Sequence, residues 1–391
     1  IIPPTGEGRA AWFNMADYHV FSSTNLTNWE DHGVIVSQDK VPWADSSAYS
    51  MWAPDCIARN GKFYFYFPTR PKDTTRYGEG FRIGVAIADK PEGPYIPQPQ
   101  PIEQVKGIDP NVFIDKDGQA YLYWAEGELY CAKLKDNMLE LASEPVVLKY
   151  VPQKGLKEGP FVLERDGIYY LTYPHVAGKI ERLEYATGDN PLGPFKFTGV
   201  IMDESASGCW TNHHSLIDYK DQWFYHDMDL SPHFDKNRSI RADSLFFNPD
   251  GTIQKVQPTL RGIGITRATD TIQIDRYSNA AENTLVSFND PENTFEGWNI
   301  TLGEKQWVQY NTVSFPEKLT QIKLKVASAT GGILQLRSDD YKGELLAEIK
   351  VPAGTSWQVI ETPLEKYSAG IHNLLLLNEK NTVKIDWVQF K

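Results

Sequence analysis

Cysteine and long apolar runs are scarce in this 391-residue chain, and each scarcity excludes a class of protein. The three cysteines, Cys56, Cys131 and Cys209, lie far apart without CxxC spacing, which argues against a disulfide framework or a zinc knuckle. No apolar run approaches the roughly 18 residues of a membrane span. The opening IIPPTGEGRAAWF has neither a charged n-region nor a long apolar stretch, so no signal peptide is visible.

Positive charge is also in short supply. The chain has 39 Lys and Arg against 51 Asp and Glu, a formal net charge of −12. Because nucleic-acid phosphates require a basic protein face, we expect no nucleic-acid partner, and the absence of a membrane-spanning run predicts no membrane partner. The charge balance suits a protein that binds a neutral ligand, and the sequence does not indicate an oligomeric state.

Aromatic residues, in contrast, are plentiful, and they recur in runs at intervals of about fifty residues. A glycine turn precedes three of the runs, and Gln222 takes that place in the fourth. Strand-like segments flank each run, which gives about four strands per repeat, the pattern of a β-propeller blade. The runs are KFYFYFP (62–68), AYLYWAE (120–126), IYYLTYP (168–174) and QWFYHDM (222–228).

Four complete repeats cover residues from about 48 to 262, and part of a fifth precedes them. DYHVFSS (17–23) and WEDHGVIV (29–36) match the third and fourth strands of that blade. We therefore predict a five-bladed β-propeller domain over residues 1–265, in which the first two strands of blade one are absent. We expect an N-terminal segment of roughly 25–40 residues, about half a repeat, to carry them outside this sequence.

After about residue 270 the pattern changes to short alternating strands separated by turns, as in WVQYNTVSF, QIKLKVAS and KIDWVQF. Alternation of this kind suits a two-sheet sandwich. We predict an all-β protein in which a linker, residues 266–274, joins the propeller to a β-sandwich of jelly-roll type over residues 275–391. Two further blades are the alternative, but the aromatic hairpin does not recur here.

Two carboxyls hold matching positions in adjacent repeats. Asp109 and Glu158 each stand nine residues before a turn glycine, Gly118 and Gly167, which predicts the same height on the axial strands of two blades. Burial and like charges raise the pKa of a carboxyl, and glycosidases need such an acid to protonate the leaving oxygen. The alternatives are a turn Asp before proline and a solvated Glu at a strand end.

Five segments in this order resemble glycoside hydrolase family 43 over about residues 12–262. They are MWAPD, GIDPNVFIDKDGQAYLYW, KEGPFVLERDGIYYLTY, NHHS and NRSIRADSLFF. The family consists of five-bladed propellers that hydrolyse β-xylosides and α-L-arabinofuranosides, or arabinans and galactans, with inversion. The resemblance implies an exo-acting enzyme without an organic cofactor. Its substrate would be a xylo-oligosaccharide or arabinoxylan, and a secreted or periplasmic location is favoured over a cytoplasmic one.

The resemblance also implies roles for single residues. Glu158 is the general acid, and Asp109 tunes the pKa of that acid and orients it. Trp52, His214 and Arg238 match positions that line the sugar subsite, and His214 touches an axial calcium ion through water. Packing of Trp52 and His214, and a surface ion pair of Arg238, are the alternatives. The family's general base lies on the first strand of blade one, so we expect it in the absent segment.

The C-terminal segment resembles carbohydrate-binding module family 6 through EKQWVQYNTVSF, VASATGGILQLRS, GTSWQVIET and KIDWVQF. The resemblance implies a sugar site between a Tyr and a Trp, matched by Tyr310 and Trp357. Lys384 stands where an Asn is usual, and Asp275 where a Glu is usual. Asp275 and Asp386 are the expected oxygen ligands of a structural calcium ion. A module that only packs is the alternative.

A non-catalytic sugar-binding protein is the competing function, because propellers and sandwiches both bind glycans. The absence of a general base would favour it. Turnover of nitrophenyl xyloside and arabinofuranoside substrates separates the two functions.

Overall fold

The computed structural model is almost entirely β and describes most of the chain, namely residues 13–24, 26, 28–149, 151–152, 154–204, 210–219, 222–225, 240–293 and 296–391. The helical elements whose bounds lie in these ranges are α1 (Thr74–Tyr77) and a 3-10 turn at Gln38–Lys40. No helix of the described ranges is long and apolar enough to cross a membrane. The chain divides into two compact units, whose main parts are Trp29–Gln257 and Pro258–Lys391.

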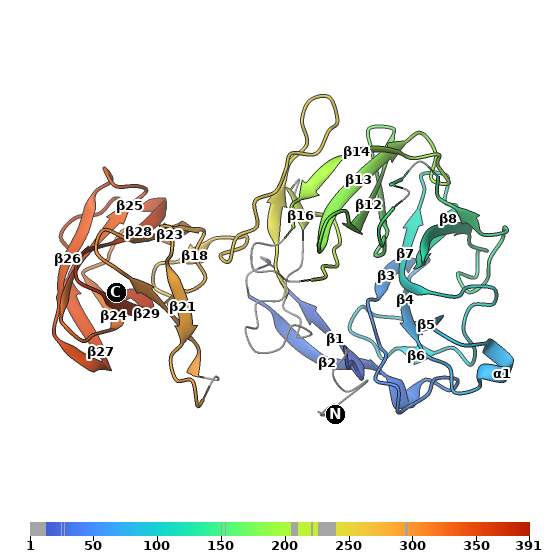
Figure 1. Ribbon diagram of the computed structural model, residues 1–391, viewed down its shortest axis with the longest axis horizontal. Helices are drawn as coiled ribbons and strands as arrows, with labels where there is room; N and C mark the ends of the chain where they lie inside the picture. The colour runs from blue at the N-terminus through green and yellow to red at the C-terminus, as the bar shows by residue number, and fades with distance from the viewer. Residues whose placement is uncertain are drawn as a thin grey trace. The chain divides into compact units, whose positions relative to one another are not determined.

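Five small antiparallel sheets, consecutive in the chain, surround a common centre in the first unit (Figure 1). This arrangement confirms the predicted five-bladed propeller. In the described residues three blades have four strands, the first blade has two and the last has three. The strands are β1 (Asp17–Ser22) and β2 (Glu30–Ser37); β3 (Asp55–Arg59), β4 (Lys62–Thr69), β5 (Arg82–Ala88) and β6 (Ile96–Pro97); β7 (Ile108–Ile114), β8 (Ala120–Glu126), β9 (Glu128–Lys133) and β10 (Val146–Val147); β11 (Phe161–Arg165), β12 (Ile168–Val176), β13 (Glu181–Gly188) and β14 (Lys196–Met202); and β15 (Ile217–Tyr219), β16 (Gln222–Tyr225) and β17 (Asp243–Leu245).

Two-residue turns explain the hairpins that open the second and fourth blades. Asn60-Gly61 joins β3 to β4, and Asp166-Gly167 joins β11 to β12, with all four residues at positive φ. Asn-Gly and Asp-Gly pairs adopt this geometry at low cost, and its twist matches that of the strands. The turn glycines noted in the sequence therefore fix the register of the strands that carry the site.

The aromatic strands hold neighbouring blades together. Tyr66 on β4 and Trp124 on β8 belong to one buried cluster, while Tyr123 on β8 and Tyr173 on β12 belong to the next. Successive residues of a strand point to opposite faces, so one aromatic strand supplies the cores on both of its sides. This is why these runs are apolar throughout instead of alternating with polar residues.

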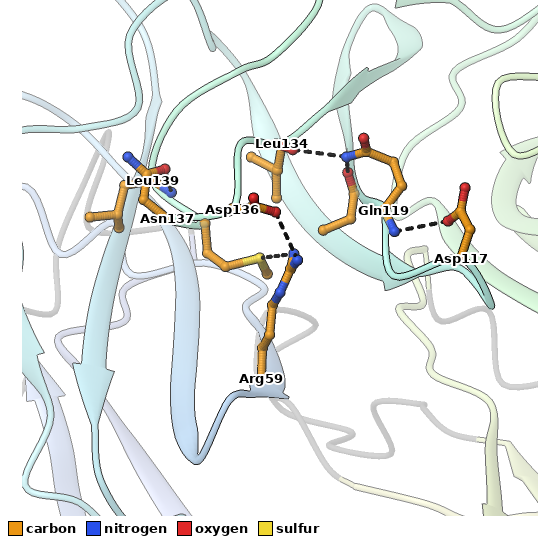
Figure 2. Close-up of polar contacts among 9 residues, drawn as sticks. Arg59, Asp117, Gln119, Leu134, Asp136, Asn137 and Leu139 are labelled. Atoms are coloured by element: carbon orange, nitrogen blue, oxygen red, sulfur yellow. Dashed lines mark hydrogen bonds and ion pairs between the residues drawn. The ribbon is translucent and has the colours of Figure 1, made fainter.

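Polar contacts join the same blades near the β3–β4 turn, as Figure 2 shows. The guanidinium of Arg59 donates to Asp136 at 3.0 Å and to the sulfur of Met138 at 3.2 Å. In the third blade the amide of Gln119 donates to the carbonyl of Leu134 at 2.9 Å. Since each of these groups finds its partner within the blades, we assign the cluster a structural role.

The second unit is a sandwich of two six-stranded sheets. One sheet has the order β18-β23-β28-β25-β26 with β20 beside β23, and the other has the order β21-β22-β29-β24-β27 with β19 beside β29. The strands are β18 (Thr266–Arg267), β19 (Ile272–Gln273), β20 (Asn279–Ala280), β21 (Leu285–Phe288), β22 (Trp298–Leu302), β23 (Trp307–Phe315), β24 (Gln321–Ser328), β25 (Gly332–Ser338), β26 (Leu345–Val351), β27 (Gly354–Pro363), β28 (Gly370–Lys380) and β29 (Val383–Phe390).

The segment expected as a linker, residues 266–274, carries two of these strands. β18 pairs with β23 and β19 pairs with β29, and Ile272 and Ile274 are buried in the sandwich core. The alternation of apolar and polar residues in TIQI suits a short edge strand, and the structure places this segment inside the second unit.

Candidate active site

Asp109 occupies a distorted point of β7. It has a φ of 56°, and the pairing with β8 shifts register between Ile108 and Asn111. A non-glycine residue at positive φ costs about 1–3 kcal/mol, and such residues gather at functional sites. The side chain is buried, and its Oδ2 accepts the N–H of Gly159 at 3.0 Å. The matched spacing in the sequence therefore places Asp109 against the segment that carries Glu158.

Glu158 lies at the end of the segment that enters β11, and its side chain is half-buried. Its N–H donates to the carbonyl of Pro174 at 3.3 Å, and its Oε1 accepts the hydroxyl of Thr211 at 3.4 Å. At Gly159 the φ is 51°, and an added Cβ would lie 2.9 Å from Nδ1 of His213. Glycine after the acid thus lets the chain around His213 approach this strand end.

A third carboxyl, that of Glu181 at the start of β13, lies beside Glu158. Its Oε2 accepts the N–H of Asn212 at 2.7 Å. Burial, and then the charge of Glu158 and a side-chain hydrogen bond with it, raise the pKa of Glu181 to about 9. Glu181 was not predicted from the sequence, because it lies on the third strand of its blade and the candidate residues were those that precede the first strands. The alternating segment KIERLEY, which places a Glu at the start of a third strand, was the available signal.

His214 is buried behind β11 and β12. Its Nε2 lies 2.6 Å from the hydroxyl of Thr172, which donates to the carbonyl of Phe161 at 3.1 Å. Because the hydroxyl proton goes to that carbonyl, Nε2 is the donor and Nδ1 is the acceptor of the ring. Burial, and then the neighbouring His213, lower the pKa of His214 well below its usual value, so the ring is neutral. Arg238, the other predicted polar contact, lies outside the described residues.

Trp52 lies in the segment before β3 and is half-buried. Its ring packs on Phe81 with centroids 4.5 Å apart, and its Nε1 donates to the carbonyl of Phe13 at 3.3 Å. The hydroxyl of Tyr18 on β1 donates to the carbonyl of Trp52. Burial, and then the charge of Asp109, raise the pKa of Tyr18, so the first blade also approaches the Asp109 carboxylate.

Asp55 and Asn111 connect three axial strands. Oδ2 of Asp55 accepts the N–H of Val112 at 2.6 Å and the amide of Asn111 at 3.1 Å. Oδ1 of Asn111 in turn accepts the N–H of Val162 at 2.9 Å. Burial raises the pKa of Asp55 to about 6, and these hydrogen bonds oppose that rise. The contacts fix the relative height of β3, β7 and β11, and hence that of the acidic residues.

In the second unit the two predicted sugar-binding aromatics lie on different sheets. Tyr310 on β23 is buried in the core, with its hydroxyl 3.1 Å from that of Thr266 and the guanidinium of Arg261 4.6 Å from its ring centroid. Trp357 on β27 is half-buried, and Nζ of Lys325 lies 5.4 Å from its ring centroid. Tyr310 is therefore enclosed by the core, whereas Trp357 is partly accessible.

Comparison with known proteins now identifies the family. Residues 8–253 match glycosyl hydrolases family 43, and residues 277–391 match the carbohydrate binding module of family 6. The chain belongs to glycosyl hydrolases family 43. The resemblance inferred from the sequence is confirmed for both units.

The family 43 enzyme has similar relatives among characterised proteins. It is 34% identical to xylosidase/arabinosidase 43A of Humicola insolens over 63% of this chain and 87% of that protein. It is 26% identical to an arabinoxylan arabinofuranohydrolase of Bacillus subtilis (strain 168) over 96% of this chain and 83% of that one. A family 43 β-xylosidase/α-arabinofuranosidase from a compost metagenome, solved calcium-free with xylotriose, superposes with a TM-score of 0.55 at 32% identity, over 62% of this chain and 84% of that one.

Calcium was predicted at Asp275 and Asp386 in the second unit of this family 43 enzyme. Asp386 is 4% exposed, and its Oδ2 accepts the ammonium of Lys325 at 2.7 Å and the amide of Asn289 at 2.9 Å. The described residues contain no group of three His, Cys, Asp or Glu side chains that could hold a metal. Lys325 already supplies the positive charge that calcium would bring, so the ion does not fit this arrangement of Asp386.

Proposed function

We propose that this family 43 enzyme releases xylose or L-arabinofuranose from the ends of xylan-derived oligosaccharides, with inversion at the anomeric carbon. The observation that carries the proposal is the half-buried carboxyl of Glu158, which adjoins Glu181 and directly precedes Gly159, whose N–H Asp109 accepts. Two buried neighbours of like charge favour the protonated acid that a glycosidase requires. The names of the relatives, xylosidase/arabinosidase and arabinoxylan arabinofuranohydrolase, support the substrate class.

In the proposed reaction Glu158 gives its proton to the glycosidic oxygen as the bond to the anomeric carbon breaks. Asp109 acts through the N–H of Gly159, which fixes the direction of the neighbouring acid. An inverting enzyme also needs a carboxylate about 6.5–9.5 Å away to activate water. The family resemblance assigns that carboxylate to the first strand of blade one, which is not among the described strands.

Trp52 and His214 complete the proposed sugar subsite, together with Arg238 on the family resemblance. The half-buried indole of Trp52 offers a flat face to a sugar ring. The neutral His214 can accept a hydrogen bond at Nδ1, which fits a water of a hydrated calcium ion as well as a sugar hydroxyl. A calcium ion bound there would contribute positive charge near the axis.

The sandwich is proposed to bind carbohydrate through exposed aromatic faces. Trp357 is the predicted residue that remains accessible. A second pair, not predicted from the sequence, is Trp307 with the exposed Tyr341, whose ring centroids are 5.7 Å apart. Tyr310 contributes to the core in this proposal.

Nitrophenyl β-xyloside, nitrophenyl α-L-arabinofuranoside and xylobiose test the proposed activity on the purified full chain. Release of xylose or arabinose, with the α- or β-configuration of the first-formed sugar read by proton NMR, is the expected result. Binding of xylo-oligosaccharides without turnover of any of the three substrates would instead establish the competing function, a non-catalytic sugar-binding protein.

A further inference from the structure

Glu181 is held rigidly against the segment that carries Thr211. Its N–H donates to the carbonyl of Trp210 at 3.0 Å, and its Oε2 accepts the N–H of Asn212 at 2.7 Å. The side chain is 1% exposed. Its second oxygen, Oε1, is buried and has no well-aligned donor among the described residues. The carboxyl therefore lacks the full set of donors that would stabilise its charged form.

Three basic side chains near Glu181 and Glu158 in the sequence contact other carboxylates. Arg182, the next residue on β13, pairs with Glu184 at 2.6 Å, and His175 lies 2.9 Å from the same carboxylate. Lys157, the residue before the acid, is buried with its Nζ 3.5 Å from Glu128. The N–H of Lys179 donates to Oε1 of Glu204 at 3.0 Å.

Within the part of the chain that the structure describes, the other groups that face Glu181 are those of Glu158 and of the segment 210–214. The hydroxyl of Thr211 donates to Oε1 of Glu158 at 3.4 Å, and Glu158 is the charged group that acts most strongly on Glu181. The titratable side chains of the facing segment are His213 and the neutral His214. Two adjacent carboxyls in a buried site cannot both ionise at low cost, so one proton is retained between them.

We propose that Glu181 is a positioning residue that shares one proton with Glu158 and thereby keeps the general acid protonated at the pH of the reaction. The proposal rests on the role of Glu158 in the proposed function. When Glu158 passes the proton to the glycosidic oxygen, the pair is left with two negative charges and regains its proton from water. Glu158 therefore holds its proton until the leaving oxygen has gained enough negative charge to take it.

Glu181→Gln tests the proposal, because it preserves shape and the contact with the N–H of Asn212 but removes the second charge. Without that charge the pKa of Glu158 falls, since a like charge raises the pKa of an acid and a neutral amide does not. We expect the alkaline limb of the pH profile of kcat/KM to move to lower pH by about one unit or more. At pH values well above the limb, a shift of one unit lowers kcat/KM about tenfold. The value of kcat/KM on the plateau below the limb changes less.

Glu184→Gln is the matched control. Glu184 is a buried carboxyl on the same strand, but its partners are Arg182 and His175. We expect this control to lower stability without moving the alkaline limb. An unshifted limb in folded, active Glu181→Gln would overturn the proposal, and so would an equal shift in both variants.

The wild-type protein provides a second measurement should Glu181→Gln fail to fold. Difference infrared spectroscopy between pH 7 and pH 10 should show a protonated carboxyl that ionises near pH 9, and Glu158→Gln should alter that signal. Absence of such a signal also overturns the proposal. If Glu158→Gln instead retains full activity on xylobiose, the proposed function itself fails, and the two failures are thereby distinguished.

Discussion

In the sandwich the buried carboxylate of Asp386 meets the ammonium of Lys325 and the amide of Asn289, whereas in the propeller the buried carboxyl of Glu181 meets another carboxyl, Glu158. Burial is nearly the same, at 4% and 1% exposure. The first arrangement compensates a charge that folding removes from water. The second gives Glu181 no counter-ion among the described residues, and a purely structural residue would not justify the resulting cost to stability.

The comparison shows which observation separates a structural carboxyl from a functional one. Depth of burial does not, because both side chains are enclosed. The partners do, because a cation stabilises the ionised form and a second carboxyl stabilises the protonated form. A carboxyl that keeps its proton at neutral pH can act as the general acid of a glycosidase, whereas a carboxyl in a sandwich core has no such role.

The largest expected effect is the loss of activity caused by replacing Glu158 in the propeller. Glu158→Gln keeps the shape of the acid but removes its proton, and general acid catalysis is worth about 10²–10⁴-fold. We expect kcat on xylobiose to fall by that factor, with a smaller loss on nitrophenyl substrates, whose leaving groups need less protonation. Steady-state kinetics on both substrates checks this. Near-native activity on xylobiose would remove Glu158 from the role of acid.

Asp109→Asn should have the next largest effect. Asn tolerates the positive φ at this position, and its side-chain carbonyl can still accept the N–H of Gly159. The variant loses one negative charge, so the pKa of Glu158 should fall and the alkaline limb should move to lower pH. Imperfect placement of the acid can cost up to about 10²-fold in kcat. An unchanged rate and pH profile would show that the charge of Asp109 has no influence on the acid.

The sandwich side of the contrast is tested by Lys325→Met. This change leaves Asp386 with the amide of Asn289 as its described partner, and a buried charge that loses its counter-ion costs about 3–5 kcal/mol. Because the Lys325 side chain is 27% exposed, we expect a smaller loss of about 1–3 kcal/mol, with activity on nitrophenyl xyloside retained. Calorimetry measures the loss, and adding Asp386→Asn should recover part of it.

Addition of calcium is an independent test of the Lys325–Asp386 ion pair. If Lys325 takes the place of the ion, calcium and chelator should leave the melting temperature of the wild-type sandwich unchanged. If calcium instead raises the melting temperature of the wild-type protein as much as that of the Lys325→Met variant, the ion binds despite the lysine.

The sequence predicted those parts of the molecule that depend on local repetition. Equal offsets from Gly118 and Gly167 predicted that the segments of Asp109 and Glu158 would adjoin, because two-residue and short turns fix the strand register. Glu181 could not be reached in this way, since its proximity to Glu158 depends on how the end of a third strand meets the 210–214 segment, a contact far apart in sequence.

Contacts between residues far apart in sequence also explain why the surroundings of Asp386 and Tyr310 in the sandwich differ from those predicted. Asp386 is the extra residue at a bulge, where Lys325 pairs with Trp387 and Val326 pairs with Ile385. A bulge changes which cross-strand neighbour a side chain meets, and the sequence carries no clear mark of it. Tyr310 was expected at a sugar site because its residue type fits, but strand alternation places it on the core face.

The smallest expected effect concerns the aromatic residues of the sandwich, and it asks whether this unit is structural throughout. Trp357→Ala should weaken retention of the full chain on insoluble xylan by about threefold to tenfold, as expected for the loss of one aromatic contact of about 0.5–1.5 kcal/mol. Tyr310→Phe is the matched control, because it removes only a buried hydroxyl that contacts Thr266. It should lower stability slightly and leave retention unchanged. Hydrolysis of nitrophenyl xyloside should be equal in both variants, since no residue assigned to the acid site lies in the sandwich. Equal retention of wild-type and Trp357→Ala would leave the Trp307–Tyr341 pair as the remaining proposed contact, to be tested by Tyr341→Ala in the same assay.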